Sequence, residues 1–525
     1  MSIIKVQLVE RNPSMASPNI LFIITDQQRA DHVGFAGNQV VQTPHLDAIA
    51  ASSTQFDNAY VANSICTPNR CSIITGRMPS AHGAASNGIS LDWHANTAVR
   101  RLKDAGYATG LVGKGHFQDW GDLPPPFDNE HIPDLPLRTY RQPLPEDWHL
   151  YESRKTHRQR YVEFPDDYYG FSHVDMVVGH SDCCLGHYEH WLRARGFDPA
   201  ELLGTMRPDS PAKAVYENWW QVRQPRLPEE LYPSRYIADR SIAFLKQQNR
   251  EQPFFLQVSF PDPHHPFTPP GKYWEMYDPA AMPLPPTYDD DHEHSTWLAR
   301  AYARRSGNLD GVVQPFGPDE DQLRHALAAQ YGMISLIDDC VGDIQTALTE
   351  LGLADNTIIV FTSDHGDMFG DHHIILKGTM HYAGCVRVPL VINHPSIEPS
   401  RQDALVSSVD IAQTLLDLAG VEAYAGMHGA SLAPIMQDSG ASVRDALLIE
   451  DDYPADILRA GQPTRMRTIM TRQGRLTRYL GADMGELYDF EADPDERRNR
   501  FGERTALEDE LTGQLIDEMT RVSWP

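Results

Sequence analysis

The sequence predicts an α/β protein whose main domain is built on a parallel sheet. Three short runs of apolar, largely β-branched residues have the pattern of strands that are buried on both faces of such a sheet. Segments with helical periodicity lie between these runs, and from about residue 440 the pattern changes to short strands and one closing helix. The chain has 525 residues, which is enough for a large core and more than one domain.

The three predicted strands share a feature at their carboxyl ends, where polar side chains follow directly. Residues 19–25 lead to Asp26, and residues 357–362 lead to Ser363 and Asp364. Residues 254–260 lead to the sequence Pro-Asp-Pro-His-His-Pro. Ligands of open α/β sheets bind just beyond the carboxyl ends of the strands. The sequence therefore predicts a functional site at this edge of the sheet.

Helical periodicity places four helices along the main domain, over residues 46–53, 235–248, 321–351 and 409–419. Residues 118–232 are rich in proline, histidine, aromatic and charged residues and carry few signals of buried strands. They are interpreted as a long insertion or lid over the site, or as a surface excursion without function. Residues 266–318 are rich in proline and aspartate and are expected to be loops.

A second, smaller domain is predicted at the C-terminal end. Its candidate strands are residues 447–451, 466–471 and 486–490, and its closing helix runs from about 506 to 522. The domain boundaries that follow are 1–439 for a catalytic α/β domain and 440–525 for an α+β subdomain.

Composition and charge narrow the classes of partner. Hydrophobic residues make up 41% of the chain and charged residues 22%, as in soluble globular proteins. The net charge of −27 repels nucleic acid and anionic membrane surfaces, so neither is expected as a partner. No apolar run is long enough to span a bilayer. The first ten residues lack the features of a signal peptide, so a cytoplasmic location with free thiols is expected.

The motif that carries most of the chemistry begins at Cys66. Residues 66–76 read Cys-Thr-Pro-Asn-Arg-Cys-Ser-Ile-Ile-Thr-Gly, which fits the frame C-x-P-x-R-x-x-I-x-T-G. This frame resembles the site at which type I sulfatases are modified. The resemblance implies that Cys66 is oxidised after translation to formylglycine, whose hydrated aldehyde is the nucleophile. Taken alone, the motif could also be a buried cysteine before a helix.

Two strand ends supply further candidate ligands. Asp26 and Gln27 follow the first strand, and Asp364 and His365 follow a later one. Two carboxylates, an amide oxygen and an imidazole suit one divalent cation. A single Asp after a strand is more often a turn or a helix N-cap. Here two adjacent pairs occur together with the cysteine motif, which favours a metal site.

Together these segments resemble the sulfatase branch of the alkaline phosphatase superfamily. The resemblance runs from about residue 19 to residue 490 and is weakest over 118–232. It rests on residues 19–32 and 363–378 as two metal motifs and on residues 486–495 as a C-terminal signature. It implies a large domain with a mostly parallel central sheet flanked by helices, and a small C-terminal subdomain with an antiparallel sheet.

The resemblance also implies roles for individual residues. The metal ligands would be Asp26, Gln27, Asp364, His365 and the oxygen of modified Cys66. Many family members have Asp in place of Gln27. A neutral amide there lowers the negative charge of the site and leaves the identity of the metal open. Calcium is the usual assignment in the family, and magnesium or manganese would also suit these ligands.

The implied catalytic residues surround the modified cysteine. Arg70 would hold the hydrate, because a guanidinium is permanently charged and presents several donors. Lys114, in Lys-x-His, would neutralise sulfate oxygens, and His116 would take a proton from the hydrate so that the sulfated intermediate collapses by elimination. His264 would protonate or stabilise the leaving oxygen together with Lys377, and His265 is the second choice for that role. Activity would require a formylglycine-generating maturation enzyme in the host.

The expected function is therefore hydrolysis of a small-molecule sulfate ester. The alternative is a phosphonate monoester hydrolase or phosphodiesterase of the same superfamily. That alternative shares the Asp-Gln and Asp-His pairs and Asn87, but those enzymes typically carry Tyr and Thr in place of Lys114 and His116. The alcohol half of the ester stays open, and so does a homo-oligomer formed through the 118–232 insertion.

Overall fold

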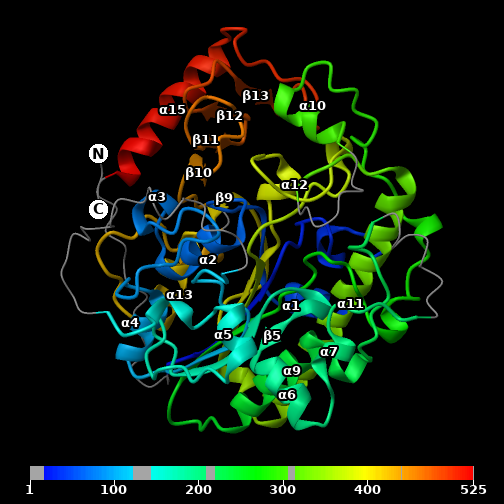
Figure 1. The fold of residues 1–525 in the computed structure, drawn as a ribbon. Helices are drawn as coiled ribbons and strands as arrows, with labels where there is room; N and C mark the ends of the chain where they lie inside the picture. The colour runs from blue at the N-terminus through cyan, green and yellow to red at the C-terminus, as the bar shows by residue number, and fades with distance from the viewer. Residues whose placement is uncertain (1–16, 122–143, 209–218, 306–313, 439, 524–525) are drawn as a thin grey trace.

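A computed structural model describes residues 17–121, 144–208, 219–305, 314–438 and 440–523. These residues form three layers around a large sheet, with a smaller sheet and the last helix stacked at one end (Figure 1). The first ten residues, on which the expected location rests, lie outside the described residues, as do 122–143 and 209–218 of the predicted insertion.

The large sheet has the strand order β5-β4-β3-β6-β1-β7-β8-β2-β9. From β4 to β7 every neighbouring pair is parallel, while β5 and β8 run antiparallel to their neighbours. The strands are β1 Asn19–Thr25, β2 Thr54–Tyr60, β3 Ala108–Gly113, β4 His173–Val178, β5 Leu185–Gly186, β6 Phe254–Ser259, β7 Thr357–Ser363, β8 Leu390–Asn393 and β9 Ser400–Ser407. This architecture confirms the predicted mostly parallel α/β fold.

Helices cover both faces of this sheet. The α-helices are α1 Pro44–Ala51, α2 Cys66–Thr75, α3 Pro79–His82, α4 Ala98–Asp104, α5 Arg154–Gln159, α6 His187–Ala194, α7 Pro199–Leu202, α9 Pro233–Lys246, α10 Trp297–Ala303, α11 Glu320–Glu350, α12 Ala383–Val386, α13 Asp410–Ala419, α14 Ala433–Gln437 and α15 Ala506–Val522. No helix of the described residues combines the length and the apolar character that crossing a membrane requires.

The side chains on the two faces of the central strands belong to two separate hydrophobic cores. All seven residues of β1 are buried, and successive side chains of a strand point to opposite faces. Phe22 and its like-facing neighbours pack with α2, α4, α13 and α14, whereas Leu21 and Ile23 pack with α1, α6, α9 and α11. Figure 1 shows these two sets of helices on opposite sides of the sheet. Burial on both faces explains the continuous apolar runs in the sequence.

The second sheet is antiparallel and has the order β10-β11-β12-β13, with strands Ala446–Tyr453, Thr464–Thr471, Gly474–Tyr479 and Gly485–Asp489. Its Leu447, Ile449 and Tyr488 share a core with Tyr382 and Val386 of the main part of the chain. Helix α15 packs Leu511 and Leu515 on the other face of this sheet. The antiparallel sheet confirms that part of the expected fold, and the boundary at residue 440 stays a prediction.

Several elements were not predicted from the sequence. The strand β4 lies inside the 118–232 segment and pairs with β3 in the large sheet, so "insertion or lid" describes only part of that segment. Helix α10 lies inside the predicted loop region 266–318. Strand β3 reads Ala-Thr-Gly-Leu-Val-Gly, and its two glycines weaken the strand signal.

Candidate active site

Four neighbouring parallel strands bring the predicted polar residues to one edge. In the register, Thr25 of β1 pairs with Ser363 of β7, Ile24 with Ser259 of β6, and Gly113 of β3 also with Ser259. Because these strands are parallel, the residues that follow them meet at the same edge. Gly113 has a φ of 106°, and a side chain there would clash with the carbonyl oxygen of Ser259. The missing side chain lets the segment after β3 turn closely over β6.

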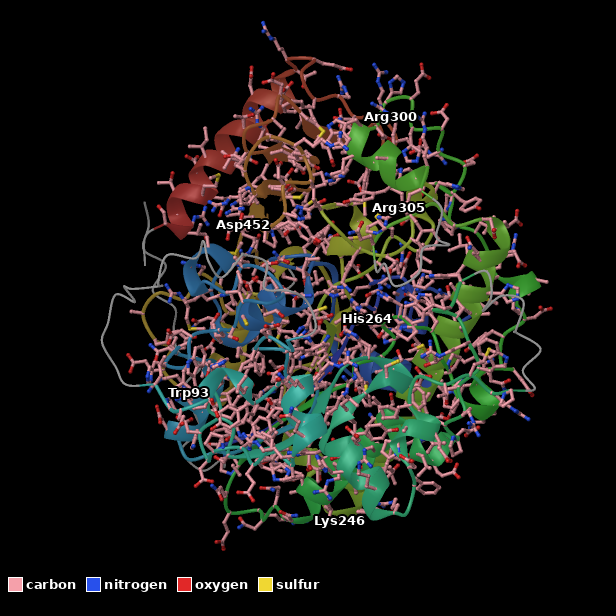
Figure 2. The ribbon with its side chains drawn as sticks, in the orientation of Figure 1. Trp93, Lys246, His264, Arg300, Arg305 and Asp452 are labelled. Carbon is pink, nitrogen blue, oxygen red and sulfur yellow. The ribbon has the colours of Figure 1, made fainter. Side chains whose placement is uncertain are left out.

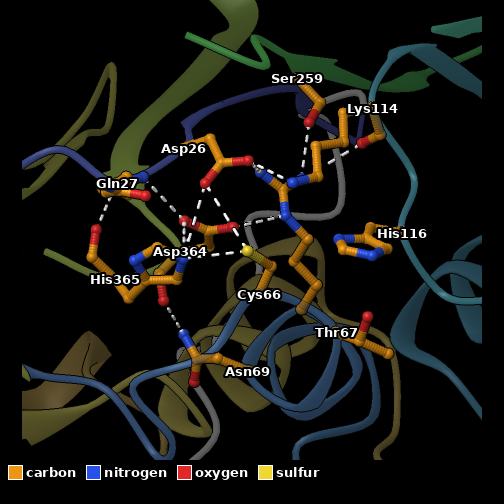
Figure 3. A network of polar contacts seen from close by, with 12 residues as sticks. Asp26, Gln27, Cys66, Thr67, Asn69, Lys114, His116, Ser259, Asp364 and His365 are labelled. Atoms are coloured by element: carbon orange, nitrogen blue, oxygen red, sulfur yellow. Dashed lines mark hydrogen bonds and ion pairs between the residues drawn. The ribbon is translucent and has the colours of Figure 1, made fainter. Parts of the chain in front are cut away.

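Cys66 is the first residue of α2, and only 1% of its surface is exposed. Its Sγ lies 3.1 Å from Nε2 of His365 and 3.8 Å from Oδ1 of Asp26. Asn69, one turn along the helix, donates to the carbonyl oxygen of Asp364. These contacts fix the start of α2 against the ends of β1 and β7 (Figure 3).

The ligand atoms of Asp26, Cys66, Asp364 and His365 lie within 4.8 Å of one another and are buried. His365 Nδ1 donates to the carbonyl oxygen of Gly366, which leaves the lone pair of Nε2 facing inward. Burial lowers the pKa of His365 to about 4, so this imidazole is neutral. Its Nε2 lies 3.5 Å from a carboxylate oxygen of both Asp26 and Asp364. A lone pair facing two carboxylate oxygens is favourable only with a cation between them, so the residues fit a divalent metal.

A second group of candidate ligands shares Asp26 and Cys66 but adds His180 and His264. On that side Lys114 Nζ already contacts Asp26 and lies 3.0 Å from Nε2 of His180. Lys114 thus occupies Nε2 of His180 and Oδ2 of Asp26, the atoms that a metal ion would need there. Arg70, by contrast, contacts Oδ2 of Asp364 and leaves Oδ1 facing Nε2 of His365. We therefore assign the metal-ligand geometry to the group that contains Asp364 and His365.

Gln27 is placed differently from the four ionisable candidates. Its Oε1 accepts a hydrogen bond from Lys377 Nζ at 2.5 Å, and its Nε2 contacts Asp367 and lies 3.0 Å from Nδ1 of His265. Its backbone N–H donates to Oδ1 of Asp364 at 3.1 Å. The amide thus links the candidate metal ligands to Lys377.

Arg70 forms ion pairs with both Asp26 and Asp364. Its Nε donates to Oδ2 of Asp364 at 2.6 Å, and Nη1 donates to Oγ of Ser259 at 2.8 Å. Burial by itself would lower the pKa of Arg70, but the charges of Asp364 and Asp26 outweigh burial and raise it. Burial would likewise raise the pKa of Asp26, but the ammonium group of Lys114 holds that pKa well below its usual range. Asp26 and Arg70 therefore stay charged.

A buried network holds His116. The backbone N–H groups of His116 and Phe117 donate to Glu152 at 2.6 and 2.9 Å. Trp120 donates its indole N–H to the same carboxylate at 3.2 Å and stacks on the His116 ring, with 3.9 Å between ring centroids. Burial, and next the charge of Lys114, lower the pKa of His116 well below its usual value. His116 is therefore a neutral imidazole, able to accept a proton.

On the opposite side, Lys377 and three histidines form a stack. Lys377 Nζ lies 2.8 Å from Nε2 of His264, whose Nδ1 contacts the carbonyl oxygen of His265. A carbonyl can only accept, so His264 carries its proton on Nδ1 and accepts from Lys377. The ring of His180 stacks on that of His264, with 3.6 Å between centroids. His264 lies deep in the molecule (Figure 2).

Several buried polar atoms around Cys66 have no hydrogen-bond partner among the described residues. They belong to side chains that the contacts above place at the site, and they are Nη2 of Arg70, Oγ1 of Thr67, Nδ1 of His116 and Nε2 of His265. Buried polar groups are normally paired, so these atoms are available to bind a ligand at the site.

The structure brings together every residue that the sequence predicted for the site, and it adds three. His180, Glu152 and Trp120 all belong to the 118–232 segment that was read as an insertion or lid. A signal for His180 was present: it follows the buried run Met176–Val178 and a glycine, just as Asp26 and Asp364 follow their strands. Glu152 had no comparable signal, because its four donors come from distant positions.

This fold and site define the class: a hydrolase of the alkaline phosphatase superfamily. A model of the family described as "Sulfatase" matches residues 18–421, and one described as "N-sulphoglucosamine sulphohydrolase, C-terminal" matches residues 370–523. The chain belongs to the sulfatase family, and it is an enzyme that hydrolyses sulfate esters.

Individual relatives cover nearly the whole chain. An arylsulfatase of Clostridium perfringens is 28% identical over 96% of this chain and 94% of its own. The phosphonate monoester hydrolase of Agrobacterium radiobacter has a TM-score of 0.74 with 25% identity over 96% of each chain. A protein solved in complex with D-glucosamine-2-N,6-O-disulfate has a TM-score of 0.70 with 22% identity, over 97% of this chain and 98% of its own.

Proposed function

We propose that this sulfatase works through formylglycine formed from Cys66 by a maturation enzyme of the host. The observation that carries the proposal is the position of Cys66 Sγ, which lies beside Asp26 and His365 at the first turn of α2. Formylglycine supplies a hydrated aldehyde whose hydroxyl can attack sulfur and whose other hydroxyl allows the sulfate to be eliminated.

In this proposal Arg70 and Lys114 bind and neutralise the anionic ester. Both side chains are buried, and each is held by a carboxylate, so their charges are positioned before the substrate arrives. Such preorganised charge stabilises the transition state more than mobile charge in water does. The local cations also offset the net charge of −27, which repels anionic substrates.

His116 is the proposed general base. It is neutral, its Nδ1 has no partner among the described residues, and it is close enough to Lys114 and Arg70 for their charges to lower its pKa further. A neutral imidazole held near the nucleophile can take the proton whose removal releases the bound sulfate. His180 contacts Lys114 and is proposed to orient its ammonium group.

Lys377 is the proposed donor to the leaving oxygen. Burial, followed by the neighbouring His180, lowers the pKa of His264 well below its usual value, so His264 does not itself carry an extra proton. The proton of this pair is therefore on Lys377, and His264 accepts its hydrogen bond at 2.8 Å. His264 would hold Lys377 in place, and His265 would hold Gln27.

The proposed metal site consists of Asp26, Asp364, His365 and the modified Cys66, with Gln27 completing it once its oxygen is released from Lys377. Calcium is the first choice, and manganese or magnesium are the alternatives, since the set is mostly oxygen with one imidazole. When bound, the cation would polarise an oxygen of the ester as a Lewis acid.

Phosphonate monoester hydrolysis is the second candidate. The phosphonate monoester hydrolases of Agrobacterium radiobacter and Silicibacter pomeroyi have TM-scores of 0.74 and 0.73 at 25% identity. The Lys114 and His116 pair favours the sulfate ester. Comparing kcat/KM for 4-nitrophenyl sulfate and 4-nitrophenyl phenylphosphonate decides between them.

Mass spectrometry tests the nucleophile directly. The tryptic peptide that ends at Arg70 contains Cys66, and protein from a host with the maturation enzyme should show the mass of the aldehyde or its hydrate. An unmodified thiol in such a host would rule out the proposed mechanism. Cys71 lies in the next peptide and should remain a thiol.

A further inference from the structure

Asp451 is a buried carboxyl group, one of whose oxygens is left unpaired by the described part of the chain. Only 2% of its surface is exposed, and its Oδ2 has no hydrogen-bond partner among the described residues. Burying an unpaired polar group costs free energy, and carboxylates are almost never fully buried without a partner. Because burying this oxygen costs free energy, we expect Asp451 to have a function.

The neighbouring acidic residues are paired, in contrast to Asp451. Arg467 of β11 lies 2.7 Å from a carboxylate oxygen of Asp452 and 3.5 Å from one of Glu450. Glu450 also accepts hydrogen bonds from the backbone and side chain of Ser80. Side chains alternate along a strand, so Asp451 lies on the opposite face of β10 from both. Arg467, which pairs with Glu450 and Asp452, is therefore not directed at Asp451.

The face that carries Asp451 is turned toward the catalytic end of the main sheet. Leu447 and Ile449, on the same face, pack in one cluster with Tyr302 of α10 and Met380. The hydroxyl of Tyr302 lies 3.2 Å from Oγ1 of Thr379, two residues after Lys377. Asp451 is near enough to Tyr302 and Tyr453 for its charge to raise their pKa values, although burial is the larger cause.

Strand β10 is also bound to the segment that precedes Cys66. The backbone N–H of Glu450 donates to the carbonyl oxygen of Ala62 at 2.9 Å, and Asn63 Nδ2 donates to the carbonyl oxygen of Glu450 at 2.5 Å. Ser64 Oγ donates to the carbonyl oxygen of Gly378 at 3.3 Å. Asp451 thus belongs to the same connected group of segments as Cys66 and Lys377, on the side of the site where the leaving oxygen is expected.

We propose that the Asp451 carboxylate accepts a hydrogen bond from a hydroxyl or ammonium group on the alcohol half of the sulfate ester. This inference rests on the proposed function and extends it to the substrate class: an alcohol with a second polar donor rather than a plain aryl group. A site built to pair a buried acceptor discriminates strongly against substrates that lack the donor.

The test uses the matured full-length enzyme and three esters. 4-Nitrophenyl sulfate has no donor, glucose 6-sulfate has hydroxyl donors, and 2-aminoethyl sulfate has an ammonium group. In Asp451→Asn, kcat/KM for the preferred donor-bearing ester relative to 4-nitrophenyl sulfate should fall at least about tenfold. The assignment is wrong if this ratio does not change, or if the wild type hydrolyses only 4-nitrophenyl sulfate. The ester whose relative kcat/KM falls shows whether Asp451 recognises a hydroxyl or an ammonium group.

Asp452→Asn is the matched control, since it changes the adjacent carboxylate on the other face of β10. The ratio should stay within about twofold of wild type, because the Asp452–Arg467 ion pair lies on the other face of β10 and is partly exposed to solvent. A tenfold fall in this variant as well would mean that the charge of the strand, and not the position of Asp451, matters.

A melting measurement is independent of any substrate. Asp451→Asn and Asp451→Leu remove a buried, unpaired charge, so both should melt at least about 1–3 °C above wild type. A lower melting temperature in both would show that Asp451 serves the fold, and the inference would fall. If the wild type has no sulfatase activity at all, the proposed function fails, but this measurement still decides whether Asp451 is retained at a cost to stability.

Discussion

At the scale of single residues, the site depends on buried charges that are paired before substrate binds. Asp26 and Asp364 each contact a cation, while the histidines around them are kept neutral by burial. This division separates groups that hold charge from imidazoles that are neutral at neutral pH.

Replacing Cys66 should abolish turnover without disturbing the fold. We expect Cys66→Ala to lower kcat by about 10⁴-fold or more, because the nucleophile is lost. Cys71→Ala is the control: Cys71 is equally buried on the same helix but packs in the core beneath the sheet. It should keep activity within a few fold and melt slightly lower. Full activity in Cys66→Ala would exclude the formylglycine mechanism.

His116→Ala should slow the second half of the reaction more than the first. With the base removed, the sulfated intermediate accumulates, so a rapid burst of alcohol precedes a turnover that is slower by about 10²–10⁴-fold. Rapid-quench kinetics with 4-nitrophenyl sulfate, and the mass of the trapped adduct, report this. Unchanged burst kinetics with no adduct would argue against the role.

The stability of the fold should depend on pH through Asp451. Burial, followed by the charge of Asp452, raises the pKa of Asp451 from 3.8 to about 7, against a smaller opposite effect of Arg467. Below about pH 4 both states hold this proton. Between pH 4 and 7 the folded protein still holds a proton that the unfolded chain has released, so the stability falls as pH rises across this range and levels off above pH 7. The melting temperature of Asp451→Asn minus that of wild type should therefore be larger at pH 8.5 than at pH 5. An equal difference at both values would contradict the raised pKa.

At the scale of elements, the carboxylate of Glu152 holds the backbone of the segment after β3. Glu152 accepts from two backbone N–H groups, the Trp120 indole and the Tyr168 hydroxyl, so all four donors converge on one side chain. His116 within this segment has a φ of 58°, a conformation that needs such support. The geometry of the proposed base thus depends on a residue outside the catalytic motifs.

Glu152→Gln should loosen this segment, because an amide NH₂ group would face donors instead of accepting from them. We expect kcat to fall about 10–100-fold with a smaller change in KM, and the burst seen in His116→Ala to appear in part. Tyr168→Phe removes only one of the four donors and should lose less than about fivefold in kcat. If kcat and KM changed only in proportion to the loss of folded protein, Glu152 would have no positioning role.

At the scale of the whole molecule, the small sheet and the main domain are joined by a common core. Arg475 of β12 is fully buried, bonds Glu486 and Glu496, and lies over the rings of Tyr382 and Tyr488, whose hydroxyls are 2.9 Å apart. Glu496 in turn accepts the backbone N–H of Ala383 at the start of α12. Because the segments after β7 and the small sheet share these contacts, they should unfold together.

Arg475→Ala should leave two buried carboxylates without their cation and cost about 3–5 kcal/mol. Calorimetry should show one transition shifted to lower temperature. Arg478→Ala, on the same strand but exposed, should shift it by about 0.5 kcal/mol or less. Two separate transitions in Arg475→Ala, with only the first shifted, would mean that the small sheet unfolds independently.

Much of the fold could be predicted because its signals are local. The runs at 19–25 and 357–362 and the closing helix at 506–522 agree with β1, β7 and α15 within one residue, since burial on both faces or periodic packing is visible in the sequence. Strands β2 and β9 were missed, because their alternating, partly exposed residues carry a weaker signal.

The sequence by itself determined the class of the protein and the residues of the strand ends, because motif spacing and strand polarity are properties of short segments. That Asp26, Cys66, Asp364 and His365 converge follows from parallel strands ending at one edge, and the structure agrees with it. Only the tertiary structure decided that His180, Glu152 and Trp120 join the site, that Gln27 bonds Lys377, and that Asp451 is left unpaired. The physical reason is that hydrogen bonds and burial are set by neighbours that lie from 32 to 350 residues apart in the chain, and no local pattern records them.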